Sequence, residues 1–251
     1  MKKFIKKTIK KFIARIIWPN TYCNEAYIKY LRKCGAKIGK RTRFIAPKEC
    51  NVDIGRAEYV TIGDDCCLSF VTILAHDYSW YVFGRKYQNL LPDPGGEVII
   101  GNNCFIGYQA CILKDTTIGD NVIIGARSVV KGKIPSNTVW AGTPARQICT
   151  LDELYERRKL SHISDAFKRY EIISRHNHKN DYEEMGYFAS LFVEHNEQNY
   201  EKLFKNIEFN GILDCPVVKE WFLNGKSLYS DKKEFEKDYL KSKLQFESQK
   251  G

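Results

Sequence analysis

The sequence predicts a mainly β fold, in which short parallel strands wind into a stacked three-sided coil between a helical arm and a mostly helical extension. The main observation is an aliphatic residue that recurs every six positions from residue 100 to residue 130. A period of six matches neither the 3.6-residue period of a helix nor the two-residue period of a strand. Each repeat is therefore a short strand plus a turn with one residue pointing inward, and stacked coils bury a continuous apolar column.

Each position of the repeat has a structural role. Gly follows the inward aliphatic residue in four repeats and relieves the turn, and a small or β-branched residue fits where two faces of the coil meet. The same phase occurs earlier at Ile62, Leu68 and Leu74, and more loosely at Ile38 and Phe44. The inward residues are Ile100, Ile106, Ile112, Ile118, Ile124 and Val130, and the corner residues are Cys104, Ala110, Thr116, Val122 and Ser128.

The end of the repeat resembles a known family. The segment IGARSVVKGKIPSNTVWAGTPARQI (residues 124–148) is similar to the last coils of maltose, galactoside, streptogramin and polysaccharide O-acetyltransferases, which are hexapeptide-repeat acyltransferases. The resemblance covers residues 35–149. It implies a left-handed parallel β-helix, a hand opposite to that of ordinary β-crossovers. It also implies acetyl-CoA as the acyl donor and a homotrimer.

This resemblance divides the chain into three parts. Residues 1–34 form a basic amphipathic arm, residues 35–149 the acyltransferase β-helix, and residues 150–251 a mostly helical extension. The repeat loses its phase between Leu74 and Ile100, so a loop over residues 76–97 leaves the coil and returns through PDPGG. In the resembled family such a loop covers an active site shared between neighbouring subunits.

His76 is the predicted catalytic base. Transfer of an acyl group from a thioester to a hydroxyl needs a base, donors for the oxyanion and alignment of both substrates. Histidine suits the first role because it titrates near neutral pH. His76 is the only histidine in the first 160 residues, and it lies where a coil ends and the loop begins, as does the catalytic histidine of the resembled family. The alternative is a buried structural histidine.

The second imidazole nitrogen of His76 needs an acceptor that fixes its tautomer. Glu97, at the return of the loop, and Asp77 are candidates, and a main-chain carbonyl is a third. Because adjacent side chains in an extended chain point apart, Glu97 is preferred. We assign Asp77, Tyr78 and Trp80 to binding of the acceptor, since aromatic rings stack on sugars. The alternative for the aromatic residues is packing within the loop or between subunits.

Backbone groups at the coil corners are expected to hold the oxyanion and the pantetheine of acetyl-CoA. By resemblance these belong to Gly107 and Tyr108 in IGYQ, and to Gly125 and Ala126 in IGAR.

The segment AGTPAR (residues 141–146) resembles the part of the family that lines the adenine end of coenzyme A. Pro144 offers that end a flat apolar surface. Arg146, with Lys131 and Lys133, offers charge to the phosphates. An ordinary turn is the alternative for Gly-Thr-Pro.

The arm concentrates the positive charge of the chain, which is +10 in total. The first 20 residues carry seven Lys or Arg and no acid, with isoleucines at three- and four-residue spacing, so an amphipathic helix is expected to end near Trp18-Pro19. Two interpretations stay open for residues 1–18: peripheral contact with an anionic membrane surface, or docking on the protein itself. The remainder is only slightly basic, so no nucleic-acid partner is expected.

No metal site is predicted, because a zinc centre on this kind of coil needs three histidines and the coil has one. Nine cysteines, no CxxC pair and no signal peptide favour a reduced, cytoplasmic protein. After residue 149 the pattern TLDE predicts a helix start, and a last helix begins near Asp231. The segments EFNGIL and FLNGKSL carry a hairpin signal.

Together these observations predict an acetyl-CoA-dependent O-acetyltransferase that acts on a sugar hydroxyl, in surface-polysaccharide or lipid-linked glycan synthesis. The nearest alternatives are an N-acetyltransferase of a nucleotide amino sugar and an antibiotic O-acetyltransferase on the same fold. A non-catalytic trimeric scaffold at the membrane is the alternative of another class.

Overall fold

The computed structural model describes residues 13–176, 182–205 and 216–248. The chain forms two compact units, residues 1–156 and residues 157–251, and each is described by itself.

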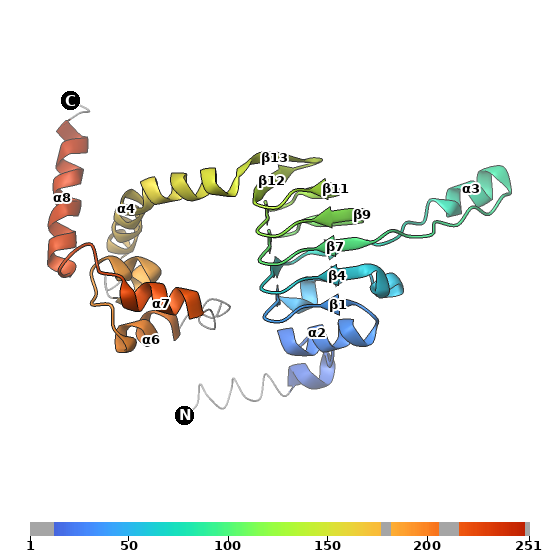
Figure 1. The fold of residues 1–251 in the computed structure, drawn as a ribbon, viewed down its shortest axis with the longest axis horizontal. Helices are drawn as coiled ribbons and strands as arrows, with labels where there is room; N and C mark the ends of the chain where they lie inside the picture. Colours follow the sequence, from blue (N-terminus) through green and yellow to red (C-terminus); the bar gives the residue numbers. More distant parts are fainter. Residues whose placement is uncertain (1–12, 177–181, 206–215, 249–251) are drawn as a thin grey trace. The chain divides into compact units, whose positions relative to one another are not determined.

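The first unit is a three-sided stack of short strands (Figure 1). The described strands of this unit pair in parallel, except for the antiparallel hairpin of β12 (Thr138–Gly142) and β13 (Ala145–Thr150). Face 1 consists of β1 (Lys37–Ile38), β4 (Val60–Ile62), β7 (Val98–Ile100) and the second halves of β9 (Cys111–Ile118) and β11 (Val129–Ile134). Face 2 consists of β2 (Arg43–Ile45), β5 (Cys67–Ser69), β8 (Phe105–Ile106), β10 (Ile123–Ile124) and β12 (Thr138–Gly142). Face 3 consists of β3 (Asn51–Val52), β6 (Thr72–Ile73) and the first halves of β9 and β11. The predicted fold class is confirmed.

An apolar column fills the interior of the coil. The six inward residues predicted from Ile100 to Val130 are at most 1% exposed, and all five predicted corner residues are buried. Each buried aliphatic side chain contributes about 1.5–3 kcal/mol to stability. The prediction was wrong at Leu74, because Ile73 is the buried residue there and pairs with Ile112. The turn after Leu68 is one residue shorter than the turn after Ile106 in the next coil, which shifts the phase.

The corner between faces 1 and 2 explains the repeated Ile-Gly-Asp/Asn pattern. A Cβ on Gly63 would lie 2.6 Å from the Gly101 carbonyl oxygen, so only glycine lets the coils approach. The following carboxylate or amide accepts a backbone N–H from the coil before it, as in Asp64 N–H to Asn102 at 2.8 Å. The next residue has a left-handed φ, which Asn and Asp tolerate. These left-handed residues are Arg41, Asp65, Asn103, Asn121 and Asn137.

Helix α2 (Asn24–Lys33) packs against the first coil. Its Tyr27 and Leu31 are buried in the core of the coil, and the Tyr27 hydroxyl donates to the Cys50 carbonyl at 3.2 Å. Residues 13–17, the described part of the predicted amphipathic helix, are helical. Two short 3₁₀ helices, η1 (Pro47–Glu49) and η2 (Ile54–Tyr59), lie between the first strands.

The predicted loop leaves face 3 after β6 and returns to face 1 at β7. It carries helix α3 (Trp80–Tyr87) and projects from the coil (Figure 1). At its base, the Gly96 N–H donates to the Ala75 carbonyl at 2.8 Å, so the two limbs meet where they join the coil.

The second unit is helical. The Thr150 and Glu153 side chains exchange hydrogen bonds with each other's backbone N–H, so the predicted capping box opens the helix α4. The FLNGKSL hairpin was a wrong prediction, because Asn224 ends a helix and the Gly225 N–H donates to the Trp221 carbonyl. EFNGIL lies outside the described residues. The elements are α4 (Leu151–Arg175), α5 (Tyr182–Met185), η3 (Gly186–Leu191), α6 (Glu197–Lys205), α7 (Pro216–Asn224) and α8 (Lys232–Ser248).

The core of this unit is aromatic, with Phe222 and Phe235 fully buried. No helix in residues 13–176, 182–205 or 216–248 is long and apolar enough to span a bilayer.

Candidate active site

His76 is paired with a carboxylate that the sequence reasoning missed. Its Nδ1 forms a hydrogen bond with Oδ2 of Asp53, which lies 23 residues earlier in the chain. The His76 side chain is 23% exposed and that of Asp53 is 6% exposed. The buried acceptor fixes the imidazole with its Nδ1–H toward Asp53, and this leaves Nε2 as the available base.

Asp53 is held by backbone donors on both sides. Its Oδ2 also accepts the Ala75 N–H at 3.0 Å, and its Oδ1 accepts the Gly55 N–H at 3.1 Å. The residue directly follows β3, and its own N–H donates to the Ile73 carbonyl of β6. Asp53 and His76 therefore lie at the ends of adjacent strands on one face, where the pairing of β3 with β6 brings them together.

Glu97 does not orient His76, which corrects the sequence prediction. Glu97 is exposed, and its carbonyl accepts the Thr116 N–H at 3.1 Å. It continues into β7 on face 1, whereas Asp53 follows β3 on face 3, the face from which His76 leaves the coil.

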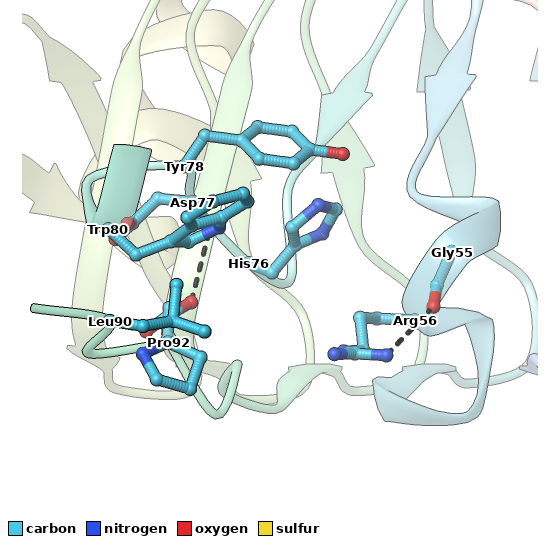
Figure 2. A pocket seen from close by; sticks show the side chains of 9 residues that line it. Gly55, Arg56, His76, Asp77, Tyr78, Trp80, Leu90 and Pro92 are labelled. Atoms are coloured by element: carbon cyan, nitrogen blue, oxygen red, sulfur yellow. Dashed lines mark hydrogen bonds between the residues drawn. The ribbon is translucent and has the colours of Figure 1, made fainter. Parts of the chain in front are cut away.

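His76 opens into a cavity of about 460 Å³. Figure 2 shows Gly55 and Arg56 on one side of the imidazole and the loop residues on the other. The Tyr78 ring meets the imidazole edge-on, with 5.0 Å between the two ring centroids. The ring centroids of Trp80 and Tyr78 lie 6.4 Å apart. The three residues predicted to bind the acceptor substrate, Asp77, Tyr78 and Trp80, thus lie together around His76. The lining residues are Gly55, Arg56, His76, Asp77, Tyr78, Trp80, Leu90, Pro92 and Asp93.

The predicted oxyanion and pantetheine residues lie at the corner between faces 2 and 3. The N–H groups of Gly107 and Gly125 bond to the next coil, at 2.8 Å from the Ile124 and Trp140 carbonyls, so they are occupied. Within the described part of the chain, no acceptor bonds to the N–H groups of Tyr108 and Ala126. Both are exposed turn residues that stand one coil apart, and their N–H groups are therefore candidate donors for a ligand.

The AGTPAR hairpin tip sits against the same corner. The Thr143 hydroxyl donates to the Arg127 carbonyl at 3.2 Å, and the Gly142 N–H donates to the Ser128 hydroxyl at 3.1 Å. Pro144 is exposed and follows a cis peptide bond. The Gly-Ala turn and the Gly-Thr-Pro tip therefore form one continuous surface.

The predicted phosphate contacts are cationic and accessible. Lys131 and Lys133 are exposed on β11, and Arg146 is exposed on β13. No set of three His, Cys, Asp or Glu side chains within the described ranges is arranged to hold a metal ion.

The base and the corner donors lie at opposite ends of face 3. His76 follows the end of β6, whereas Tyr108 precedes the start of β9, the strand that pairs with β6. Because these strands are parallel, a full strand separates the two groups within one chain. Within one chain, His76 and the corner of Tyr108 and Ala126 therefore do not meet.

The three-sided coil, its hexad core and the histidine–carboxylate pair together define a hexapeptide-repeat β-helix protein. Comparison with known proteins agrees. The family model "Bacterial transferase hexapeptide (six repeats)" matches residues 97–132. "Putative acetyltransferase YvoF" of Bacillus subtilis (strain 168) is 32% identical over 142 residues, which cover 55% of this chain and 72% of that protein. The chain therefore belongs to the hexapeptide-repeat acyltransferase family.

Two further relatives act in glycan chemistry by their names. "Putative lipopolysaccharide biosynthesis O-acetyl transferase WbbJ" of Escherichia coli (strain K12) is 38% identical over 39% of this chain and 53% of its own length. Galactoside O-acetyltransferase of the same organism is 35% identical over 46% of this chain and 60% of its own length. The matched segments thus span little more than half of these two proteins.

Proposed function

We propose that the protein transfers an acetyl group from acetyl-CoA to a hydroxyl of a sugar, in the synthesis of a surface polysaccharide or a lipid-linked glycan. The observation that carries this proposal is the His76–Asp53 pair, which opens into a cavity lined by Tyr78 and Trp80. Family membership supports the acyl-transfer chemistry. The names of the relatives support a sugar acceptor.

The residues suit direct transfer in a ternary complex. Nε2 of His76 takes the proton of the acceptor hydroxyl, whose oxygen attacks the thioester carbonyl. The negative charge that develops on the carbonyl oxygen is stabilised by a backbone N–H, with those of Tyr108 and Ala126 as our candidates. The C–S bond then breaks, and the proton on His76 passes to the departing thiolate of coenzyme A. Asp53 stabilises the imidazolium between these steps.

We propose that the site is completed by a second copy of the chain in a homotrimer. The separation of His76 from the corner of Tyr108 and Ala126 supports this, because the donor corner of one subunit can face the base of its neighbour. Pro144, Arg146 and Lys131 would then hold the nucleotide end of coenzyme A on the neighbour's hairpin side.

The proposed reaction is tested by mass spectrometry of acetyl-CoA incubated with sugars, nucleotide sugars and glycan lipids. We expect a product that is heavier than the acceptor by one acetyl group. Mild hydroxylamine should remove this acetyl group, because it cleaves an ester and leaves an amide intact. A hydroxylamine-resistant product would assign an N-acetyltransferase instead. If no product forms and calorimetry also detects no binding of acetyl-CoA, the enzyme assignment is overturned in favour of a scaffold.

We also propose that the protein is cytoplasmic and contacts the inner face of the membrane through residues 1–18. Ile13, Ile16 and Ile17 share one side of a helix, and they are 47%, 66% and 57% exposed. Seven Lys or Arg and no acid lie in the first 20 residues. Exposed isoleucines together with unopposed positive charge suit an anionic bilayer, which would bring the enzyme to a lipid-linked acceptor.

Replacing Ile13, Ile16 and Ile17 together with serine is expected to lower the affinity for phosphatidylglycerol vesicles by more than about tenfold, since each buried methylene contributes ~0.8 kcal/mol. Co-sedimentation measures the change, and Ile148→Ser is the matched control because Ile148 is similarly exposed, at 58%, on the coil. Binding that is equal for the triple variant and the control would show that the arm docks elsewhere.

A further inference from the structure

An ion cluster at the base of the loop joins both limbs of the loop to the coil. The ammonium of Lys114 bonds to Oδ2 of Asp77 at 2.7 Å and forms a shorter contact with Oδ1 of Asp93. The other oxygen of Asp93 accepts the Asp77 N–H at 3.0 Å. Lys114 belongs to β9 of the coil, while Asp77 begins the loop and Asp93 precedes its return.

The cluster is partly shielded from water. The side chain of Asp93 is 10% exposed and that of Lys114 is 22% exposed, whereas that of Asp77 is 46% exposed. Lys114 holds the pKa of both carboxyl groups below the ordinary value, and the two carboxylates raise the pKa of Lys114 in turn. All three groups are therefore charged at neutral pH. Without the ammonium, two carboxylates would face each other with no cation between them.

The walls of the cavity depend on the same two carboxylates. Asp77 is adjacent to His76, and its Oδ1 accepts the Ser79 N–H at 2.9 Å, which fixes the turn that carries Tyr78 and Trp80. Asp93 lines the opposite side of the loop with Pro92 and Leu90. Both stretches of the loop wall seen in Figure 2 are thus tied to the coil through one side chain.

We propose that Lys114 is a positioning residue, which holds the loop wall of the acceptor cavity in place against His76. This inference rests on the proposed acetyl transfer. Lys114 does not line the cavity, so it acts through Asp77 and Asp93. Neither Asp77 nor Asp93, the ion-pair partners of Lys114, is among the candidate acetyl-CoA residues. The loss of Lys114 should therefore affect the acceptor and spare the donor.

The test compares Lys114→Met, which keeps the length and removes the charge, with Lys114→Arg and the double variant Lys114→Met/Asp93→Asn. For Lys114→Met we expect a KM for the acceptor raised about tenfold or more and a lower kcat, with an unchanged KM for acetyl-CoA, since misplaced binding groups lose alignment. Lys114→Arg should restore most of the activity. The double variant should recover part of it, because the asparagine removes one of the two uncompensated charges and can still accept the Asp77 N–H. Lys37→Met is the control, because Lys37 is an exposed lysine on β1.

Hydrogen exchange provides a readout that needs no turnover. In Lys114→Met the amides of residues 76–97 should exchange faster than in the wild type, while those of β8 and β10 stay protected. Loop protection equal to that of the wild type would overturn the inference, whether or not a substrate is known. So would acceptor kinetics within twofold of the wild type, or a double variant no better than Lys114→Met. A wild-type protein that transfers no acetyl group but shows the exchange difference would instead count against the proposed function alone.

Discussion

Replacing His76 with alanine is expected to lower kcat/KM for acetyl transfer by about 10²–10⁴-fold, the contribution of a well-placed general base. Acetyl-CoA should bind with unchanged affinity, because its candidate contacts lie at the corner of Tyr108 and Ala126. The measurement is the rate of acetylated product by mass spectrometry. Calorimetry of acetyl-CoA binding is done on the same preparations.

His162→Ala is the matched control, since His162 is an exposed histidine on α4. It should retain the activity of the wild type. A His76→Ala variant with more than a tenth of the wild-type rate would assign His76 to structure and require another base.

Replacing Asp53 with asparagine is expected to lower kcat by about 10²-fold, because a partner that orients a functional histidine contributes about that factor. The amide keeps the shape of the carboxylate and can still accept the Ala75 N–H, while its NH2 group replaces the oxygen that accepts the Gly55 N–H. The charge that stabilises the imidazolium is removed. The KM for acetyl-CoA should not change.

Glu97→Gln separates the two candidate partners of His76 in the same assay. If Asp53 orients the base, Glu97→Gln should keep the wild-type kcat. The Glu97 residue is exposed, and its backbone carbonyl, which the substitution leaves in place, accepts the Thr116 N–H. The reverse pattern, a large loss in Glu97→Gln and none in Asp53→Asn, would return the role to Glu97. Thermal unfolding of each variant shows whether a loss of rate follows a loss of fold.

Much of the fold could be predicted from the sequence because burial in the coil repeats locally. Each coil presents the same environment as its neighbours, so Ile118 repeats the site of Ile100 and Ile124 that of Ile106, and they leave a periodic trace in the chain. The position of His76 at a break in that period could be found in the same way. The phase failed at Leu74, where a turn shortened by one residue changes which side chain points inward.

The partners of the site could not be predicted in this way. The pairing of Asp53 with His76 depends on the register between β3 and β6 and on the turn of η2, which departs from the six-residue period. The one available signal was an acid directly after Val52, in NVDIG. That pattern does not indicate which residue the acid contacts. The Asn-Gly of FLNGKSL had a similar fault, because the same dipeptide can end a helix as well as turn a hairpin.

The coil, its inward column, the family and the position of the candidate base His76 could thus be predicted from the sequence. Only the folded chain shows which carboxylate meets His76, which turn N–H groups have no acceptor among the described residues, and how Lys114 joins Asp77 to Asp93. The physical reason is that burial is set by each residue's own position in a repeat. A hydrogen bond or ion pair between coils is set by the lengths of all the turns that lie between its two partners.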